Sequence, residues 1–218
     1  GGPGSGKSSF CNIFAANSAE ELRAATLTTV FVPLHHFDPN ESLLTAVEKF
    51  ISEKTLLKFN PLHPDNRQAV RTLLIFDGLD ELSQTGHVGE KVAVEFVRAI
   101  ESAQSQVNSG TNAGLLVILT GRELVIQANR AAFRGERLLD VLPFCPQKDH
   151  SNSDWPKHGD PACLEADQRH LWWKRYGELT GKGYSQLPVE LDTESLRELT
   201  AQPLLNYLVA LSKDRDRI

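Results

Sequence analysis

The first residues of the chain form a glycine-rich pattern suited to holding phosphate groups. Residues 1–8, GGPGSGKS, fit G-x-x-x-x-G-K-[ST], and a helical pattern follows at once. Glycines allow backbone N–H groups to surround phosphate oxygens, Lys7 would reach the β- and γ-phosphates, and the Ser8 hydroxyl would ligate Mg²⁺. The alternative is a glycine-rich turn that caps a helix. The candidate binding residues are Gly1, Gly2, Pro3, Gly4, Ser5, Gly6, Lys7, Ser8 and Ser9.

Carboxylates follow a short apolar segment near the middle of the chain. Leu73–Phe76 is apolar enough for a buried strand, and Asp77 comes directly after it. Ligands bind at the carboxyl edge of a parallel sheet, so Asp77 is a candidate Mg²⁺ ligand. Gly78 stands where many P-loop ATPases carry a glutamate, so either Asp80 or Glu81 would polarise the attacking water, or hydrolysis would be slow. The alternative for Asp80 and Glu81 is a solvated acidic turn that caps the next helix.

The segments GGPGSGKSS and LLIFDGLDEL together resemble the NACHT family of signal-transduction P-loop ATPases, within the STAND class of molecular switches. The resemblance spans nearly the whole chain. It implies that LVILTGR is a strand ending in a phosphate-sensing element, in which Arg122 senses the γ-phosphate. Glu123 stands where the family usually has proline, and its carboxylate can pair with Arg122 in competition with phosphate. The alternative for Arg122 is a surface arginine at the start of a helix.

The resemblance also covers the segment AQPLLNYL near the end of the chain. It implies that Pro203 packs near the nucleotide base, and that a winged-helix domain with a nucleotide-contacting histidine comes next in the full-length protein. A proline at a helix start offers an apolar surface without an unsatisfied N–H group. The alternative is an ordinary first-turn proline with no ligand contact.

The function that the resemblance implies is a switch that binds ATP or ADP with Mg²⁺ between the sheet edge and a helical subdomain. Hydrolysis of ATP to ADP and phosphate would be weak, and the nucleotide state would control homo-oligomerisation and effector signalling, as in innate-immune or antiphage proteins. Its partners would be further copies and the winged-helix, sensor and effector regions of the same protein. The alternatives are an AAA-type or helicase-like motor and a scaffold that only holds ADP. Gly78 argues against the motor.

Alternating strand and helix patterns predict the scaffold that positions these residues. Segments rich in Val, Ile and Leu separated by helical patterns favour an α/β fold, with a parallel sheet between helices and a small helical subdomain after it. Phe10, Ile13 and Phe14 fall at helical spacing, and Asp38–Asn40 is a candidate helix cap. The strand leading into the glycine-rich loop would precede Gly1. The expected strands are 28–34, 73–76, 115–120 and 138–144, and the expected helices 7–16, 43–54, 88–107 and 122–133.

The composition changes after residue 144, where a polar stretch without periodicity begins. The expected parts are a P-loop NTPase core (1–144), a polar insertion (145–163) and a helical subdomain truncated at its C-terminus (164–218). In the helical subdomain, Leu171, Trp172 and Tyr176 share a helical face, and either Trp172 or Trp173 is expected in the core. The insertion holds four possible zinc ligands whose spacing fits no common finger, which favours a surface loop. They are Cys145, His150, His158 and Cys163.

Composition excludes several classes of protein. The 218 residues, 40% hydrophobic and 23% charged, can bury a core, and the net charge of -5 carries no nucleic-acid signature. Apolar runs such as Leu73–Phe76 and Leu115–Leu119 are short, far below the roughly 20 residues of a membrane span. The three cysteines and the absence of a secretory signal favour a cytoplasmic setting. The chain has no methionine, so we expect it to be a piece of a longer protein.

Overall fold

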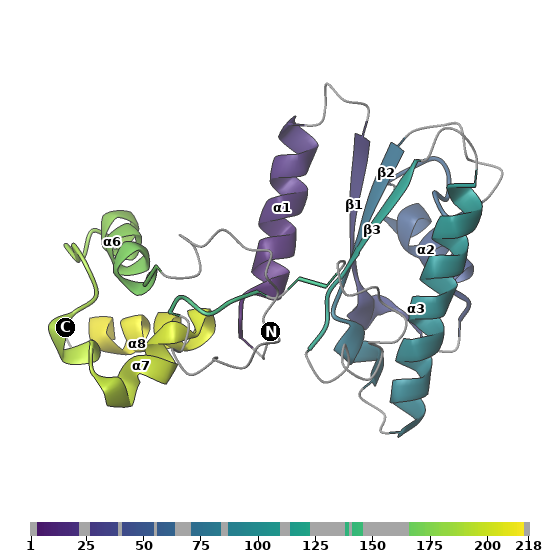
Figure 1. Ribbon diagram of the computed structural model, residues 1–218. Coiled ribbons are helices and arrows are strands. Elements are labelled where there is room, and N and C mark those ends of the chain that lie inside the picture. The colour runs from purple at the N-terminus through teal and green to yellow at the C-terminus, as the bar shows by residue number, and fades with distance from the viewer. Residues whose placement is uncertain are drawn as a thin grey trace. The chain divides into compact units, whose positions relative to one another are not determined.

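The contacts within the chain divide it into two compact units. The computed structural model describes residues 4–21, 27–38, 41–54, 56–63, 71–83, 87–109, 114–122, 138–139, 141–145 and 166–215. The α/β unit comprises Lys7–Leu139, and the helical unit comprises Asp140–Ile218 together with Gly2–Gly6. All three described strands belong to the α/β unit, as Figure 1 shows.

The sheet of the α/β unit is parallel, as the sequence predicts. Its strands β1 (Leu27–Pro33), β2 (Arg71–Asp77) and β3 (Leu115–Leu119) lie side by side in the order β1-β2-β3. The register pairs Val30 of β1 with Leu74 of β2, and Leu74 with Val117 of β3. The central strand β2 is also the most buried, because it has a hydrogen-bonded neighbour on either side and helices over both faces.

Helices cover both faces of the sheet, because successive side chains of β2 point to opposite sides. On one face, Leu73 and Ile75 pack with α1 (Lys7–Glu21). On the other, Leu74 and Phe76 share a larger core with α2 (Leu43–Glu53) and α3 (His87–Val107). In Figure 1, α1 lies on one side of the sheet and α2 and α3 on the other. The residues of α2 and α3 that are buried in the larger core are Val47, Phe50, Ile51, Ala93, Val97, Ile100 and Val107.

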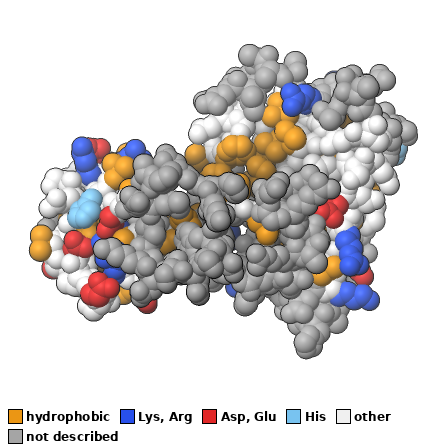
Figure 2. All heavy atoms as spheres, in the orientation of Figure 1, with side chains coloured by type: hydrophobic (Ala, Val, Ile, Leu, Met, Phe, Trp, Pro, Cys, Tyr) orange, Lys and Arg blue, Asp and Glu red, His pale blue; other side chains and the backbone are white. Residues whose placement is uncertain are grey.

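The first helix confirms the predicted element but not the face that its apolar residues suggest. Phe10, Ile13 and Phe14 are 50%, 61% and 37% exposed. Cys11 and Ser18 are buried instead, since these small side chains let α1 pack closely on the bulkier side chains of the sheet. Hydrophobic side chains are visible on the surface of the α/β unit in Figure 2. Helical spacing therefore predicted the element correctly, and packing on the sheet determines which of its faces is buried.

Two other predictions at element boundaries are corrected by hydrogen bonding. The cap of α2 is Ser42, whose Oγ accepts the N–H of Thr45 at 3.2 Å, and not Asp38–Asn40. The described residues of 138–145 form no strand. Phe144 N–H donates to the carbonyl of Ala201 (2.8 Å), and Phe144 O accepts Gln168 N–H (2.7 Å), so this segment bonds to helical residues rather than to a neighbouring strand.

The predicted helix over 122–133 begins at a residue that the structure places outside any helix, since Arg122 has irregular backbone. Residues 123–133 lie outside the described part of the chain. The other predicted helices of the α/β unit are confirmed, α1 and α3 with slightly longer bounds.

The helical unit contains α6 (Arg169–Thr180), α7 (Glu194–Ala201) and α8 (Pro203–Arg215), with a short 3-10 turn, η7 (Val189–Leu191). Trp173 is fully buried and its Nε1–H donates to Asn206 Oδ1 at 2.9 Å, while Trp172 is half-buried and stacks on Tyr176. The expectation of one core tryptophan is confirmed. Leu171 is 49% exposed, so it does not share the packed face as predicted. No helix in the described ranges is both long enough and apolar enough to cross a bilayer.

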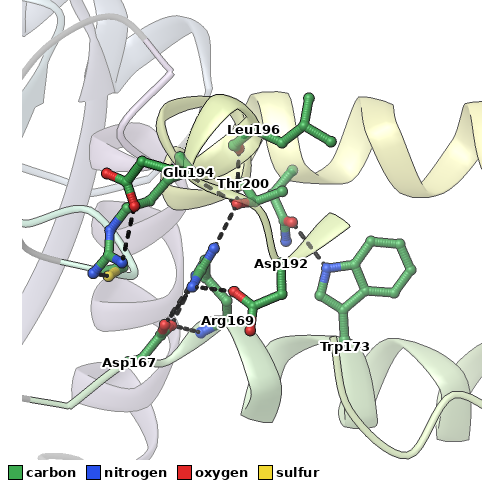
Figure 3. A network of polar contacts seen from close by, with 10 residues as sticks. Asp167, Arg169, Trp173, Asp192, Glu194, Leu196 and Thr200 are labelled. Atoms are coloured by element: carbon green, nitrogen blue, oxygen red, sulfur yellow. Dashed lines mark hydrogen bonds and ion pairs between the residues drawn. The ribbon is translucent and has the colours of Figure 1, made fainter. Parts of the chain in front are cut away.

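A buried arginine joins the segments of the helical unit. Arg169 is only 2% exposed, and Figure 3 shows its guanidinium between Asp167, Asp192 and Thr200. Its Nη2 donates to Asp167 Oδ2 at 2.6 Å and to Asp192 Oδ1 at 2.9 Å, and its Nη1 donates to Thr200 Oγ1 at 2.9 Å. A buried charge is stable only when it is paired and hydrogen-bonded, so the start of α6, the loop after η7 and the end of α7 are held to one side chain.

We predict that Asp167→Asn lowers the stability of the helical unit near neutral pH. Burial alone would raise the pKa of Asp167, but its hydrogen bonds with Arg169 outweigh burial and hold that pKa below the usual value. Stability from a lowered carboxylate pKa is present above the unfolded pKa, about 3.9, and is lost as the pH falls through the folded value. We expect a loss of about 1 to 3 kcal/mol at pH 7 that shrinks below about pH 4.

Urea unfolding followed by tryptophan fluorescence checks this, because all three tryptophans follow residue 150. Glu178→Gln, a neutralised carboxylate on the exposed surface of α6, is the matched control. Equal midpoints for the two variants at pH 7, or a difference that is as large at pH 3 as at pH 7, would contradict the expectation.

Candidate functional site

The described part of the glycine-rich loop lies against the start of α8, within the helical unit. Gly4 and Gly6 have φ of +74° and +89°, a region that favours glycine. Gly4 O accepts the N–H of Leu204 at 3.2 Å, and a Cβ on Gly4 would lie 3.1 Å from Leu204 Cβ. A Cβ on Gly6 would lie 3.9 Å from Pro203 Cγ. Pro203 is thus beside the loop, although its contact with a base stays a prediction, and Gly1–Pro3 lie outside the described residues.

The residues after the loop open α1. Lys7 is the first residue of the helix and is half-buried, whereas Ser8 and Ser9 are exposed in its first turn. No acidic side chain stands in that turn, so nothing there cancels the positive potential of the helix N-terminus. An exposed Ser8 hydroxyl at this position is accessible to a ligand. Its predicted bond to Mg²⁺ stays a prediction.

A hydroxyl group orients the carboxylate at the end of β2. Asp77 is the last residue of β2, and Thr120 follows β3 directly. Thr120 Oγ1 donates to Asp77 Oδ1 at 2.5 Å and accepts the N–H of Gly78 at 3.1 Å. The backbone of Thr120 also bonds to both sides of this turn, since its N–H donates to Phe76 O and its O accepts Leu79 N–H. One carboxylate oxygen of Asp77 is therefore held in place by the neighbouring strand.

The turn after Asp77 depends on glycine. Gly78 has a φ of +91°, and a Cβ there would lie 3.0 Å from Glu81 Cγ. Its carbonyl accepts the N–H of Glu81 at 2.8 Å, which opens the 3-10 turn η4 (Leu79–Ser83). A side chain at position 78 would be strained by its backbone conformation and by the contact with Glu81. The glycine in the position where many P-loop ATPases carry glutamate thus has a local structural cause.

The two carboxylates of η4 have different surroundings. Asp80 is mostly buried, with 15% of its side chain exposed, and it pairs with Arg122. Its Oδ2 lies 2.8 Å from Arg122 Nε, and its Oδ1 accepts the backbone N–H of Arg122 at 3.1 Å. Glu81 is exposed. In the sequence Asp80 and Glu81 are equivalent candidates for polarising a water molecule. In the structure they differ in exposure and in their partners.

Charged groups from three segments converge around Lys7. Burial, the largest cause, lowers the pKa of Lys7 below its usual value; the carboxylate of Asp80 opposes this, Arg122 adds to it, and Asp77 opposes it. The charges of all three groups therefore act on the ammonium group of Lys7. The α/β unit therefore brings four predicted site residues together at the ends of β2 and β3: Lys7, Asp77, Asp80 and Arg122.

The described residues hold no ready-made metal centre, since none of them form a group of three or more His, Cys, Asp or Glu side chains. Mg²⁺ usually keeps several water ligands and binds one or two protein oxygens together with substrate phosphates, so Ser8 and Asp77 could serve it without such a group. Of the possible zinc ligands only Cys145 is described, and its Sγ accepts a hydrogen bond from Arg197 Nη2 at 2.8 Å. His150, His158 and Cys163 lie outside the described ranges.

Thr120 is the site residue that sequence analysis did not assign. The feature of the sequence that could have indicated it is a polar residue directly after an apolar strand. In the sheet, that strand lies next to β2, which ends in aspartate. Only the register shows its importance, because Phe76 pairs with Leu119 and so places the following residues, Asp77 and Thr120, beside each other.

The chain matches no protein-family model, no curated protein and no solved structure. The fold and the cluster of charges define its class: an α/β unit with two cations and two carboxylates gathered where parallel strands end.

We predict that Thr120→Val loosens the turn at the end of β2, whereas Thr120→Ser preserves it. Valine has a similar shape but leaves Gly78 N–H without its acceptor and Asp77 without its donor, a loss of about 1 to 3 kcal/mol. Amide hydrogen exchange at Gly78 measures this directly. We expect exchange about fivefold or more faster in the valine variant. Wild-type exchange at Gly78 in Thr120→Val would show that the hydroxyl does not hold the turn.

Proposed function

We propose that the protein is an ATP-binding switch of the NACHT type, which holds Mg²⁺ with ATP or ADP and hydrolyses ATP slowly. The observation that carries the proposal is the convergence of Lys7, Asp77 and Arg122 in one cluster of charges. Lys7 directly follows the glycine-rich loop, and Asp77 ends the central strand. A triphosphate with its metal needs this combination: cations for the phosphate oxygens, a carboxylate for Mg²⁺ and backbone N–H groups for the remaining oxygens.

The backbone supports the proposal independently of the charges. Gly4 and Gly6 have positive φ, a conformation in which a loop can direct N–H groups toward an anion. The helix that follows has no acidic residue in its first turn, where the helix dipole is positive. In open α/β sheets, ligands bind outside the carboxyl ends of the strands, where Asp77 and Thr120 lie.

Slow hydrolysis is the expected consequence of the turn at Gly78. The turn has no glutamate next to Asp77, and both oxygens of Asp80 bond to Arg122. Glu81 is the exposed carboxylate of η4, so the proposal gives it the role of polarising the attacking water. In this proposal Arg122 contacts the γ-phosphate, and Pro203, beside the loop, packs near the base.

The cellular role proposed rests on the resemblance to the NACHT family. In this proposal the protein is cytoplasmic, it assembles into homo-oligomers when ATP is bound, and sensor and effector regions of the full-length protein use this change to signal. The left-handed backbone at Gly78, which disfavours a side chain there, favours a switch over a continuously working motor, because a motor needs an efficient catalytic carboxylate in that place.

We predict that Lys7→Ala weakens ATP binding by about tenfold or more, since hydrogen bonds to charged groups contribute about 1.5 to 3 kcal/mol each. Titration of the protein with a fluorescent ATP analogue in the presence of Mg²⁺ measures the effect. Lys91→Ala, which removes an exposed lysine of α3 paired with Glu95, is the matched control. Wild-type affinity in Lys7→Ala, or no ATP binding by the wild-type protein, would refute the proposed function.

We predict that Glu81→Gln slows phosphate release and prolongs the ATP-bound state, because glutamine cannot accept the proton of the attacking water. Single-turnover hydrolysis with radiolabelled ATP and the mass of the nucleotide-bound particles measure both effects. We expect more ATP-bound oligomer than in the wild type. Phosphate release that is unchanged in Glu81→Gln would exclude Glu81 as the group that polarises the water.

A further inference from the structure

The ion pair between Asp80 and Arg122 has a geometry that restricts what Asp80 can do. Both carboxylate oxygens are engaged by the same residue: Oδ1 accepts the backbone N–H of Arg122 at 3.1 Å, and Oδ2 lies 2.8 Å from its Nε. The side chain of Asp80 is 85% shielded from solvent, as 15% of it is exposed. Because both oxygens are engaged and little of the side chain reaches solvent, this carboxylate is poorly placed to orient a water molecule.

The same geometry leaves most of the guanidinium group available. Nε is the nitrogen nearest the aliphatic part of the arginine side chain, and fixing it together with the backbone N–H fixes the plane of the whole group. The side chain of Arg122 is 54% exposed. Its ion-pair partner within the described residues is Asp80. The terminal amino groups carry four of the five donors of a guanidinium, and such a fork suits the oxygens of a phosphate group.

The backbone around the pair is already fixed by other hydrogen bonds. Leu79 N–H donates to Thr120 O at 2.8 Å, and Thr120 N–H donates to Phe76 O at 2.9 Å. The turn that carries Asp80 and the segment that carries Arg122 are therefore joined before any side chain contributes. The ion pair then orients the exposed side chain of Arg122, which the backbone hydrogen bonds alone cannot do.

We propose that Asp80 is a positioning residue: its carboxylate holds Arg122 so that the terminal amino groups contact the γ-phosphate of ATP, and it does not itself activate water. This inference rests on the proposed function. Because ADP lacks the γ-phosphate, Asp80 contributes to the preference for ATP over ADP and contributes nothing once Arg122 is removed. The cluster supports this role, since the charges of Asp80 and Arg122 both act on Lys7, the predicted phosphate-binding cation.

A double-mutant cycle tests the proposal. ATP and ADP affinities are measured with Mg²⁺ for the wild type, Asp80→Ala, Arg122→Ala and the double variant, and Glu101→Ala, an exposed carboxylate of α3, serves as the control. We expect each single variant to lower the ATP-to-ADP affinity ratio by about tenfold, and the double variant to lower it no further than Arg122→Ala. Asp80→Asn, whose amide oxygen can still accept the backbone N–H of Arg122, should keep part of the preference.

A measurement without nucleotide tests the geometric half of the proposal. The Nε–H of Arg122 should exchange slowly with solvent in the wild type and rapidly in Asp80→Ala, as observed by NMR of arginine side chains. Unchanged exchange in Asp80→Ala would overturn the proposal, because the carboxylate would then not hold the guanidinium. Slow exchange in the wild type that is lost in Asp80→Ala would support it.

The outcomes of the double-mutant cycle distinguish a failure of the role proposed for Asp80 from a failure of the proposed function. ATP binding that depends on Lys7, together with an affinity ratio unaffected by Asp80→Ala, would overturn the role of Asp80 and leave the proposed function standing. Additive effects of Asp80→Ala and Arg122→Ala would do the same, as would an equal loss of ATP and ADP affinity in Asp80→Ala. No ATP binding by the wild type would overturn both.

Discussion

The parallel pairing of the central strand β2 with both of its neighbours is the constraint on which the α/β unit depends. Parallel strands end at the same edge of a sheet, so Asp77 at the end of β2 meets Thr120 just after β3. The same alternation of side chains gives β2 one face for α1 and another for α2 and α3. Because β2 is buried on both faces, it holds the residues that follow it in place.

Two carboxylates near this buried strand have partners that limit their freedom. Thr120 holds Asp77, and Arg122 holds Asp80, so carboxylates close to an apolar core are neither isolated nor freely hydrated. The helical unit applies the same rule more strictly at Arg169, where two carboxylates and a hydroxyl surround a guanidinium that is 2% exposed. The two networks differ in solvent exposure: Arg169 is buried, whereas about half of the side chain of Arg122 is exposed.

The sequence predicted those elements whose patterns are local. Apolar runs gave the three strands, and Pro203 at the first turn of α8 follows from the fixed φ of proline. The side of α1 that faces the sheet could not be predicted, because helical spacing marks both Phe10–Phe14 and the small residues around Cys11, and only packing chooses between them. The supposed strand at 138–144 failed for a similar reason: its composition suits a strand, but Phe144 finds its hydrogen-bond partners among helices.

The candidate site, like the fold, could be predicted from the sequence only in part. Motif spacing predicted Lys7 and Asp77 as ligands of phosphate and Mg²⁺, since the chemistry of phosphate binding restricts residue types at fixed positions, and the resemblance to the NACHT family predicted Arg122. The division of roles between Asp80 and Glu81 needed coordinates, because adjacent carboxylates in one turn are equivalent in sequence and differ only in what they touch. The left-handed conformation of Gly78 also brings the backbone of Glu81 back to it, forming the turn that carries Asp80 toward Arg122. A glutamate at position 78 would oppose that turn, so in the proposed switch the geometry that orients the sensing arginine excludes the side chain that would make hydrolysis fast.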